Sequence, residues 1–290
     1  MRLTTGTDAI RRPELTLFPF DDLAIPYQHG VQLQLNGFRQ SVDAPSNVVI
    51  PLGPPGTPDS RIATYYGTVH RIGDELWMWY LGQGDLDQRW RQRVCLATSR
   101  DGRHWEKPSL GLVNYGGSRA NNLVDLMGGQ NHITACLVFH EPDDPDPGRR
   151  FKLVFHEWDV YKHHLAVAFS PDGLRWHESS HNPVGPSFEP MGGVKRNGAY
   201  YVNGQGGRHW SPLGASRRLV THSSYDFEHW TEATCLGLRR DGVPPHVAIA
   251  GRNAGPQIHL GATLWDRGNV LVGFYGMWNG HPSNGTCQRL

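Results

Sequence analysis

Short apolar or alternating runs, separated by polar turns rich in Gly, Pro and Asp, follow one another along most of the chain. Such runs favour β-strands, and no long stretch repeats at the 3.6-residue period of a helix. We therefore predict an all-β protein with little helix. The first strands are expected at residues 65–70, 76–80 and 94–98, with a turn at residues 72–75 and a polar loop at residues 82–92.

A recurring motif closes these sets of strands. Ser-x-Asp, with a Trp six residues after the Ser, begins at Ser99, Ser170 and Ser224, each time directly after an apolar strand. A repeat of this kind indicates a modular β-architecture. The strands predicted for the later modules are residues 133–139, 151–155, 164–169, 191–195, 199–203, 218–223, 257–264 and 270–275. Asn197-Gly198 is the strongest hairpin turn, because both residues accept a positive φ.

Four strands per module is the pattern of a propeller blade. The fold predicted is a five-bladed β-propeller of four-stranded antiparallel blades, or a fragment of one. The last blade is incomplete, because the fourth module has no Ser-x-Asp copy. We expect one domain overall, in which residues 1–59 contribute closing strands, such as residues 31–35, and residues 60–290 form the blades.

Composition narrows the function classes. The chain has 290 residues, of which 38% are hydrophobic, and 35 Gly with 21 Pro indicate many tight turns. A net charge of +1 gives no electrostatic reason to bind nucleic acid, and no run approaches the ~20 apolar residues of a membrane helix. The four cysteines have no metal-binding spacing and no apolar leader is visible. We expect a cytoplasmic protein, and the sequence does not determine its oligomeric state.

The Asp residues of the repeat are its most conspicuous carboxylates: Asp101, Asp172 and Asp226. An Asp in this position accepts hydrogen bonds from the backbone two residues on, and a following Gly permits an unusual backbone. The third copy has Phe227 in place of that Gly. We interpret these carboxylates as turn residues. In a four-stranded meander such 3–4 turns lie opposite the starts of the first strands and the 2–3 loops.

The opposite end therefore carries the candidate chemistry. Its loops combine carboxylates with aromatic residues, as a carbohydrate site requires, because sugars offer hydroxyls to hydrogen-bond and an apolar face to stack on. The predicted partner is a small-molecule carbohydrate. The candidate binding residues are His70, Trp90, Arg91, Asp159, Trp210, His259 and Trp278. For Trp278, stacking on substrate and simple packing remain equal alternatives.

Three of the 16 histidines lie on or beside predicted inner strands: His70, His132 and His259. They could hold an axial metal or supply an acid–base group, or they are three unrelated hydrogen-bonded histidines. No spacing signature links them, so no cofactor is predicted, and a structural or axial metal held by these three histidines stays an alternative.

Two segments carry a family resemblance. One is Leu-Trp-Met-Trp-Tyr at residues 76–80, followed by the first repeat at residues 97–108; the other is Phe188-Glu189-Pro190, followed by Lys-Arg-Asn-Gly-Ala-Tyr-Tyr at residues 195–201. The chain resembles the five-bladed β-propeller glycoside hydrolases of families 32 and 43 and their relatives. The resemblance implies that Glu189 is the general acid.

The first inner strand of those enzymes begins with an Asp that acts as nucleophile or base. Here residues 63–70 carry no carboxylate, and the nearest is Asp59. The orienting Asp of the second blade has no clear match either, because Asp125 precedes its strand by several residues. Asp59, Asp125 and Asp159 are the candidate bases.

The leading hypothesis is a glycoside hydrolase-like enzyme that cleaves a glycosidic bond in an axial cleft. Glu189 would protonate the glycosidic oxygen, and Asp125 or Asp59 would activate water or attack the anomeric carbon. The alternatives are a non-catalytic carbohydrate-binding propeller and a histidine- or metal-dependent propeller enzyme acting on a substrate that is not a sugar.

Overall fold

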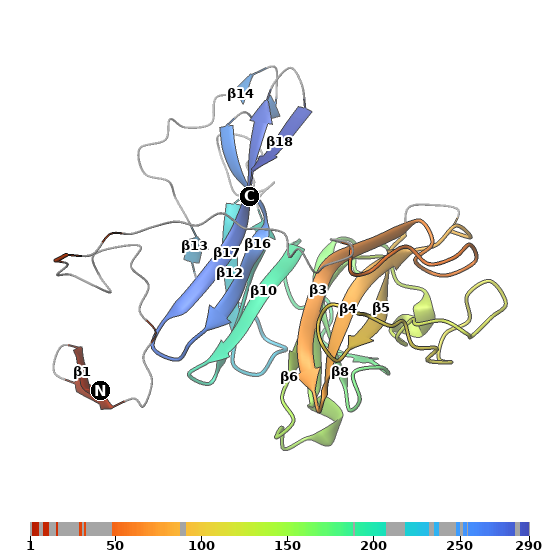
Figure 1. Cartoon of the computed structure of the whole chain (residues 1–290), viewed down its shortest axis with the longest axis horizontal. Coiled ribbons are helices and arrows are strands. Elements are labelled where there is room, and N and C mark those ends of the chain that lie inside the picture. The colour runs from red at the N-terminus through yellow and green to blue at the C-terminus, as the bar shows by residue number, and fades with distance from the viewer. Residues whose placement is uncertain are drawn as a thin grey trace. The chain divides into compact units, whose positions relative to one another are not determined.

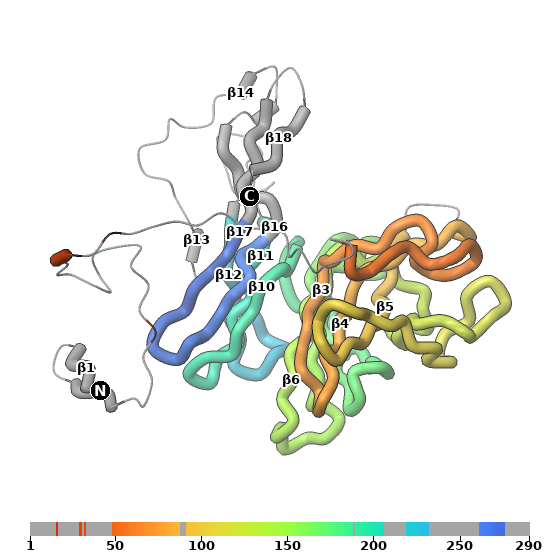
Figure 2. The backbone as a smooth tube through the Cα atoms, viewed as in Figure 1, coloured from red at the N-terminus to blue at the C-terminus, as the bar shows by residue number. Residues whose placement is uncertain are grey.

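The structure is a computed structural model that describes most of the chain. Figure 2 draws in colour the residues whose backbone and side chains are both described. The residues described are 2–5, 8–11, 16, 29–30, 32, 48–87, 91–187, 189–206, 218–231, 235–237, 248–249, 252–253, 255–281 and 285–289. This part is all-β with antiparallel sheets, and its helices are two single 3-10 turns, Met127–Gly129 and Pro147–Arg149. Within these residues, no helix is long and apolar enough to cross a membrane.

The chain divides into two compact units. One consists of Met1–Asn47 with Leu264–Phe274, and the other of Val48–Thr263 with Tyr275–Leu290. In the smaller unit, strands β1 (Arg2–Thr5) and β2 (Asp8–Arg11) pair antiparallel. There Thr16 N–H donates to Asn269 Oδ1 (3.1 Å), and Asn269 Nδ2 donates back to Thr16 O (2.7 Å). The predicted strand at residues 31–35 lies outside the described residues, apart from Gln32.

The larger unit is built from sheets whose strands follow chain order. The first sheet is β3 (Ile62–Ile72), β4 (Glu75–Gln83) and β5 (Arg93–Ser99). The second is β6 (Ile133–His140), β7 (Phe151–Glu157), β8 (His164–Ser170) and β9 (His177–Glu178). The third is β10 (Glu189–Arg196), β11 (Ala199–Gly206), β12 (Arg218–Ser224) and β13 (Cys235–Gly237).

A further sheet orders β16 (Gly255–Asp266), β17 (Leu271–His281) and β18 (Gly285–Arg289), and β14 (Ala248–Ile249) pairs with β15 (Arg252–Asn253). Every strand predicted in the four modules is confirmed to within a few residues. The predicted hairpin turn is confirmed as well, with φ of 51° at Asn197 and 80° at Gly198.

The first strands of consecutive sheets are neighbours. Strand β6 packs against β3 on one side and β10 on the other, as Figure 1 shows. Val138 N–H in β6 donates to Thr68 Oγ1 in β3 (2.9 Å), and the Val138 carbonyl accepts from His70 Nε2 (2.7 Å). In the same way, Ala262 N–H in β16 donates to Asn203 Oδ1 in β11 (2.7 Å). Side-chain hydrogen bonds to backbone therefore join one sheet to the next.

Hydrophobic cores fill the spaces between sheets. One core combines residues of the first and second sheets, including Trp79, Leu96, Phe155 and Trp176. Another combines residues of the second and third sheets, including Val167 and Val202. The Trp of the second repeat, Trp176, belongs to the first of these cores and so packs between two modules.

The Ser-x-Asp turns form as predicted. In the first copy, Asp101 Oδ1 accepts the backbone N–H of Arg103 and of His104, each at 2.8 Å. The second and third copies repeat this pattern around Asp172 and Asp226. The residue after the Asp has a φ of 75° at Gly102, 73° at Gly173 and 73° at Phe227. The third turn thus keeps a left-handed backbone without a glycine.

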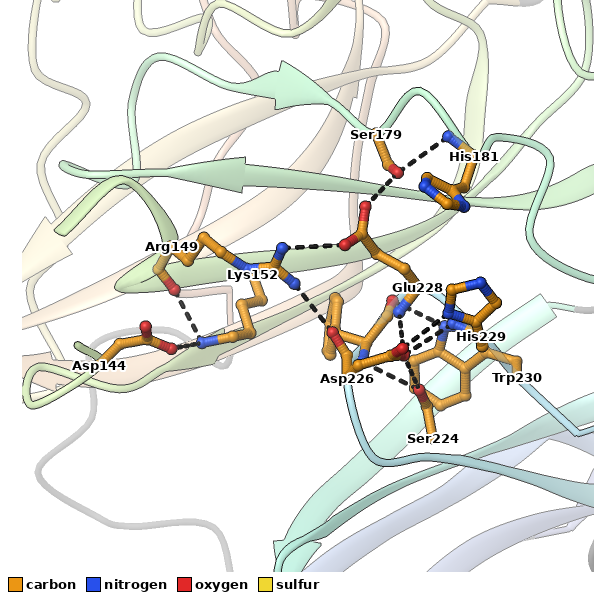
Figure 3. Close-up of polar contacts among 11 residues, drawn as sticks. Asp144, Arg149, Lys152, Ser179, His181, Ser224, Asp226, Glu228, His229 and Trp230 are labelled. Atoms are coloured by element: carbon orange, nitrogen blue, oxygen red, sulfur yellow. Dashed lines mark hydrogen bonds and ion pairs between the residues drawn. The ribbon is translucent and has the colours of Figure 1, made fainter. Parts of the chain in front are cut away.

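A charged network joins the second and third sheets near these turns (Figure 3). Lys152, 2% exposed, places its ammonium group 2.6 Å from Glu141 and 2.5 Å from Asp144. Arg149 pairs with Glu228 of the third turn at 2.9 Å. Burial alone would raise the pKa of Glu141, but hydrogen bonds led by that from Lys152 hold it below its usual value.

Candidate functional site

The strand register shows which side chains share an end of the sheets. Ile62 pairs with Gln83, Ile133 with Glu157, and Glu189 with Gln205, so each first strand begins where its second strand ends. The Ser-x-Asp turns follow the ends of β5, β8 and β12 and lie at the other end of the sheets. We call the first of these ends the Glu189 end.

Glu189 is the first residue of β10 and is half-buried. Its Oε2 accepts a hydrogen bond from Gln205 Nε2 across the strand pair (3.2 Å). The backbone here is closely packed, because a Cβ at Gly204 would lie 1.9 Å from the Glu189 carbonyl oxygen. Any side chain at position 204 would therefore displace the residue predicted to be the general acid.

Asp59, a candidate base, is 1% exposed and lies within the first sheet's side-chain packing. Its Oδ2 accepts from Lys107 Nζ (2.5 Å) and from the hydroxyl of Tyr80 (2.6 Å). Lys107 also donates to the carbonyl of Pro51 (2.5 Å). Burial, with the nearby Cys95 and Asp59, raises the pKa of the Tyr80 hydroxyl well above its usual value. The Asp59 carboxylate is thus saturated by internal donors and closed to solvent.

Asp125, another candidate base, is half-buried, and its backbone pairs with the segment that follows the second Ser-x-Asp turn. Its N–H donates to the Leu174 carbonyl, and its carbonyl accepts from Trp176 N–H, both at 2.8 Å. As a candidate base, Asp125 was expected near Glu189, but its backbone pairs beside a turn that closes the opposite end.

A polar cluster does assemble from two sheets at the Glu189 end. Arg91, which precedes β5, pairs with Asp159, which follows β7, at 3.0 Å. His132, directly before β6, places Nδ1 3.8 Å from the other carboxylate oxygen of Asp159. The side chains of Arg91 and Asp159 are 32% and 49% exposed, so both can reach a molecule in solvent. Burial lowers the pKa of His132.

Glu157 shapes the loop that carries Asp159. Its side chain is fully buried, yet its two oxygens accept four backbone N–H groups. The donors are His132 (3.3 Å), Asp159 (3.0 Å), Val160 (2.6 Å) and Tyr161 (2.9 Å). A buried carboxylate without a cation is stable only when such donors satisfy it. This carboxylate therefore acts as the internal anchor of the loop rather than as a group offered to substrate.

Trp158 lies in the same loop. Its ring stacks on His132 with centroids 5.6 Å apart and planes 19° apart, and the His163 ring meets it edge-on at 3.8 Å. The indole is therefore packed against two imidazoles and does not present an exposed face for stacking.

His70 and His132 do not converge. His70 pairs with Trp77, close to the turn at residues 73–74, whereas His132 precedes β6 at the Glu189 end. The Val138 carbonyl that His70 contacts is six residues along β6, roughly 20 Å from His132 at the strand rise per residue. The interpretation of a metal shared by His70 and His132 is therefore wrong. Among the described residues, no three or more His, Cys, Asp or Glu have metal-binding geometry.

Four predicted binding residues cannot be placed by their side chains. Trp90 and Trp210 lie outside the described residues, and so do the side chains of His259 in β16 and Trp278 in β17.

An apolar groove of about 380 Å³ lies on the first sheet. Its lining residues are Val48, Val49, Ile50, Ala63, Thr64, Tyr65, Met78 and Tyr80. None of them carries a carboxylate, so the groove does not provide acid–base chemistry.

Sequence reasoning missed three residues that define these environments. Gln205 could have been found by counting from the Asn197-Gly198 turn, although a bulge between Pro190 and Gly192 shifts the register. Glu157 is two residues before Asp159, but the sequence does not show that its carboxylate turns inward. Lys107 is 48 residues from Asp59, and no local pattern connects them.

No protein-family model matches this chain, and no curated protein matches it. Solved structures do. A putative glycoside hydrolase from Parabacteroides distasonis superposes with a TM-score of 0.51 at 16% identity, covering 88% of this chain and 78% of its own.

A second structure comes from the GH130 family of mannoside phosphorylases, which contains glycoside hydrolases that target β-1,2 mannosidic linkages in Candida mannan. It superposes with a TM-score of 0.52 at 16% identity and covers 86% of this chain and 72% of its own. The chain thus has an all-β, glycoside-hydrolase-like fold.

Proposed function

We propose that the protein is a glycoside hydrolase whose general acid is Glu189. One observation carries the proposal: a half-buried carboxyl group begins an inner strand at the end of the sheets opposite the Ser-x-Asp turns, held by the side-chain amide of Gln205. A carboxyl group held in this way can deliver a proton to a glycosidic oxygen as the bond to the anomeric carbon breaks.

The proposal includes a finer architecture. We infer that the sheets within residues 60–290 are blades of a five-bladed propeller. Support comes from the adjacency of β3, β6 and β10 and from the likeness to glycoside hydrolase folds. In such a ring the inner strands surround the axis, and the substrate would enter at the Glu189 end.

Substrate recognition is assigned to the ion pair of Arg91 and Asp159. Its guanidinium offers donors and its carboxylate offers acceptors, a combination that suits the adjacent hydroxyls of a sugar ring. Both groups are accessible to solvent. Trp90, Trp210, His259 and Trp278 remain proposed contacts to the sugar, and His70 is a weaker one because it lies toward the turn end of β3.

The second carboxylate would activate water or attack the anomeric carbon. Asp125 is half-buried and pairs through its backbone beside the second Ser-x-Asp turn, and Asp59 would first have to release Lys107. Asp159 is the remaining candidate and already stands at the Glu189 end. The distance between the second carboxylate and Glu189 would decide the stereochemistry of hydrolysis: about 5 Å for retention and about 6.5–9.5 Å for inversion.

A non-catalytic carbohydrate-binding protein is the second candidate. The observation that favours it is the saturation of Asp59 by Lys107 and Tyr80, together with the pairing of the Asp125 backbone beside a Ser-x-Asp turn. These contacts leave the recognition pair of Arg91 and Asp159 intact while removing candidate bases.

A panel of glycosides with sugar leaving groups, whose oxygen must be protonated as the bond breaks, tests the proposal with wild type, Glu189→Gln and the matched control Glu75→Gln. Glu75 begins β4 at the opposite end of the same sheets and is partly exposed. We expect turnover to fall about 10²–10⁴-fold in Glu189→Gln alone. Turnover that survives in Glu189→Gln would refute the assignment. Sugar binding by calorimetry without any turnover in wild type would support the binding protein instead.

A further inference from the structure

We propose that His181 and His229 together bind a divalent transition-metal ion, such as Zn²⁺, where the second and third sheets meet near the Ser-x-Asp turns. His181 follows β9 of the second sheet, and His229 belongs to the third turn. Their ring centroids are 5.1 Å apart with planes at 78° (Figure 3). This pair lies outside the Glu189 end, and the proposal does not depend on the function assigned there.

The ring separation matches that of two imidazoles on one metal. A Zn–N bond is about 2.0–2.1 Å, and the nitrogen lies about 1.1 Å from its ring centroid, so two tetrahedral ligands have centroids about 5 Å apart. The observed 5.1 Å therefore lets a metal bind with small side-chain adjustments. Imidazole nitrogen suits Zn²⁺, Cu²⁺ and Ni²⁺, which defines the class of ion.

The ring of His229 and the backbone of His181 are each held by a further contact. Asp226 Oδ2 lies 2.6 Å from Nδ1 of His229, which fixes the ring and leaves Nε2 as the metal-binding atom. The backbone N–H of His181 donates to Ser179 Oγ (3.1 Å), and Ser179 Oγ donates to Glu228 Oε1 (2.5 Å). Carboxylate support of a ligating imidazole is the usual arrangement around protein-bound zinc.

The site is open and lies in a negative field. The His229 side chain is 72% exposed, and His181 is exposed, so an ion can arrive with its waters and keep some as ligands. Asp226 and Glu228 supply negative charge, part of which Arg149 compensates through its pair with Glu228. An ion held here would link a segment of the second sheet to a turn of the third.

The repeat supplies a matched control. In the first turn, His104 has the same pairing with Asp101 at 2.6 Å, but no second histidine ring contacts it among the described residues. In the second turn, Arg175 takes the corresponding position. A metal that binds any exposed Asp–His pair would bind His104 as well, whereas the proposed site needs His181.

The test is calorimetric titration of the full chain with ZnCl₂, comparing wild type, His181→Ala, His229→Ala and His104→Ala. One binding site should weaken by about tenfold or more in each of the first two variants and stay unchanged in His104→Ala. Circular dichroism checks that all four proteins are folded. Zn²⁺ should raise the thermal midpoint of wild type and His104→Ala but not of the other two. Identical titrations in all four proteins, or no Zn²⁺ binding by wild type, would overturn the proposal.

Discussion

The ammonium group of Lys107 lies 2.5 Å from Oδ2 of Asp59, a carboxylate that is 1% exposed. Removing one partner of a buried ion pair leaves an uncompensated charge, which usually costs about 3–5 kcal/mol. We expect Lys107→Met to lower the free energy of unfolding by this amount in urea denaturation. Changing Asp59 to Asn in the same protein should recover part of the loss, because no buried charge then remains unpaired.

An exposed ion pair serves as the control for Lys107. Arg100 lies 3.7 Å from Glu75, and its side chain is 85% exposed. Arg100→Ala should change the free energy of unfolding by less than about 1 kcal/mol, because solvent screens such pairs. Equal losses in the Lys107 and Arg100 variants would contradict a special role for the buried pair.

The left-handed backbone at Phe227 predicts an unusual order of stability between two variants. Phe227 is fully buried, with a φ of 73°. Loss of the ring should cost about 3–5 kcal/mol in both Phe227→Ala and Phe227→Gly. Only glycine relieves the backbone strain, so we expect the Gly variant to be more stable than the Ala variant by about 0.5–1 kcal/mol. Chemical denaturation measures the difference, and a less stable Gly variant would argue against strain at this turn.

Two glycines in equivalent turn positions differ in how much space surrounds them. A Cβ at Gly173 would lie 3.0 Å from Trp79 Cζ2 and 3.1 Å from Phe151 Cδ1, whereas at Gly102 the nearest atom, in Leu76, is 3.4 Å away. Both Ala variants carry the cost of a left-handed backbone, about 1–2 kcal/mol. Gly173→Ala adds overpacking, so its free energy of unfolding should be lower than that of Gly102→Ala by about 1 kcal/mol. Its urea midpoint should therefore be lower as well. Equal midpoints for the two variants would show that the turn can shift away from Trp79.

His156 predicts a pH dependence of stability. It is 3% exposed and contacts Thr134 Oγ1 through Nδ1 (2.5 Å) and the His163 carbonyl through Nε2 (2.8 Å). Burial lowers the pKa of His156 to about 4. The unfolded chain, in which a His titrates near 6.5, binds more protons between these values. Stability is therefore complete above pH 6.5 and falls as the pH drops toward 4, on the order of 2 kcal/mol at pH 4.5.

Urea denaturation at pH 7 and pH 4.5 measures this effect. The difference in the free energy of unfolding between the two pH values should shrink in His156→Gln, which cannot take up the proton. The exposed His177, changed to Gln, is the control and should leave the difference as in wild type. An NMR titration of His156 near its ordinary pKa would contradict the explanation.

The strands were predictable because their signal is local. Alternation of apolar and polar side chains follows from the two-residue period of a strand, and Asn197-Gly198 and the Ser-x-Asp turns owe their shapes to residues in direct succession. From these local elements, meander topology correctly indicated that Glu189 and the Ser-x-Asp turns lie at opposite ends of the sheets.

The site was less predictable because its contacts join distant segments. His70 was assigned to the Glu189 end, but β3 is eleven residues long and His70 lies near its other end. Asp125 was a candidate base there although it precedes β6 by several residues, and the backbone at that point pairs with the segment that follows the second Ser-x-Asp turn. Residue type alone does not show how far along a strand a side chain lies or which path a connecting segment takes.

The sequence by itself determined the all-β class, the modular order of strands and the structural use of the repeat's Asp residues, since each depends on side chains and dihedral angles of near neighbours. Only the tertiary structure decided which carboxylates are closed off and which stay accessible. Lys107 reaches Asp59 across 48 residues, the loop backbone closes on Glu157, and Arg91 meets Asp159 from another sheet. The state of an acidic side chain depends on its burial and donors, and packing between distant segments supplies both.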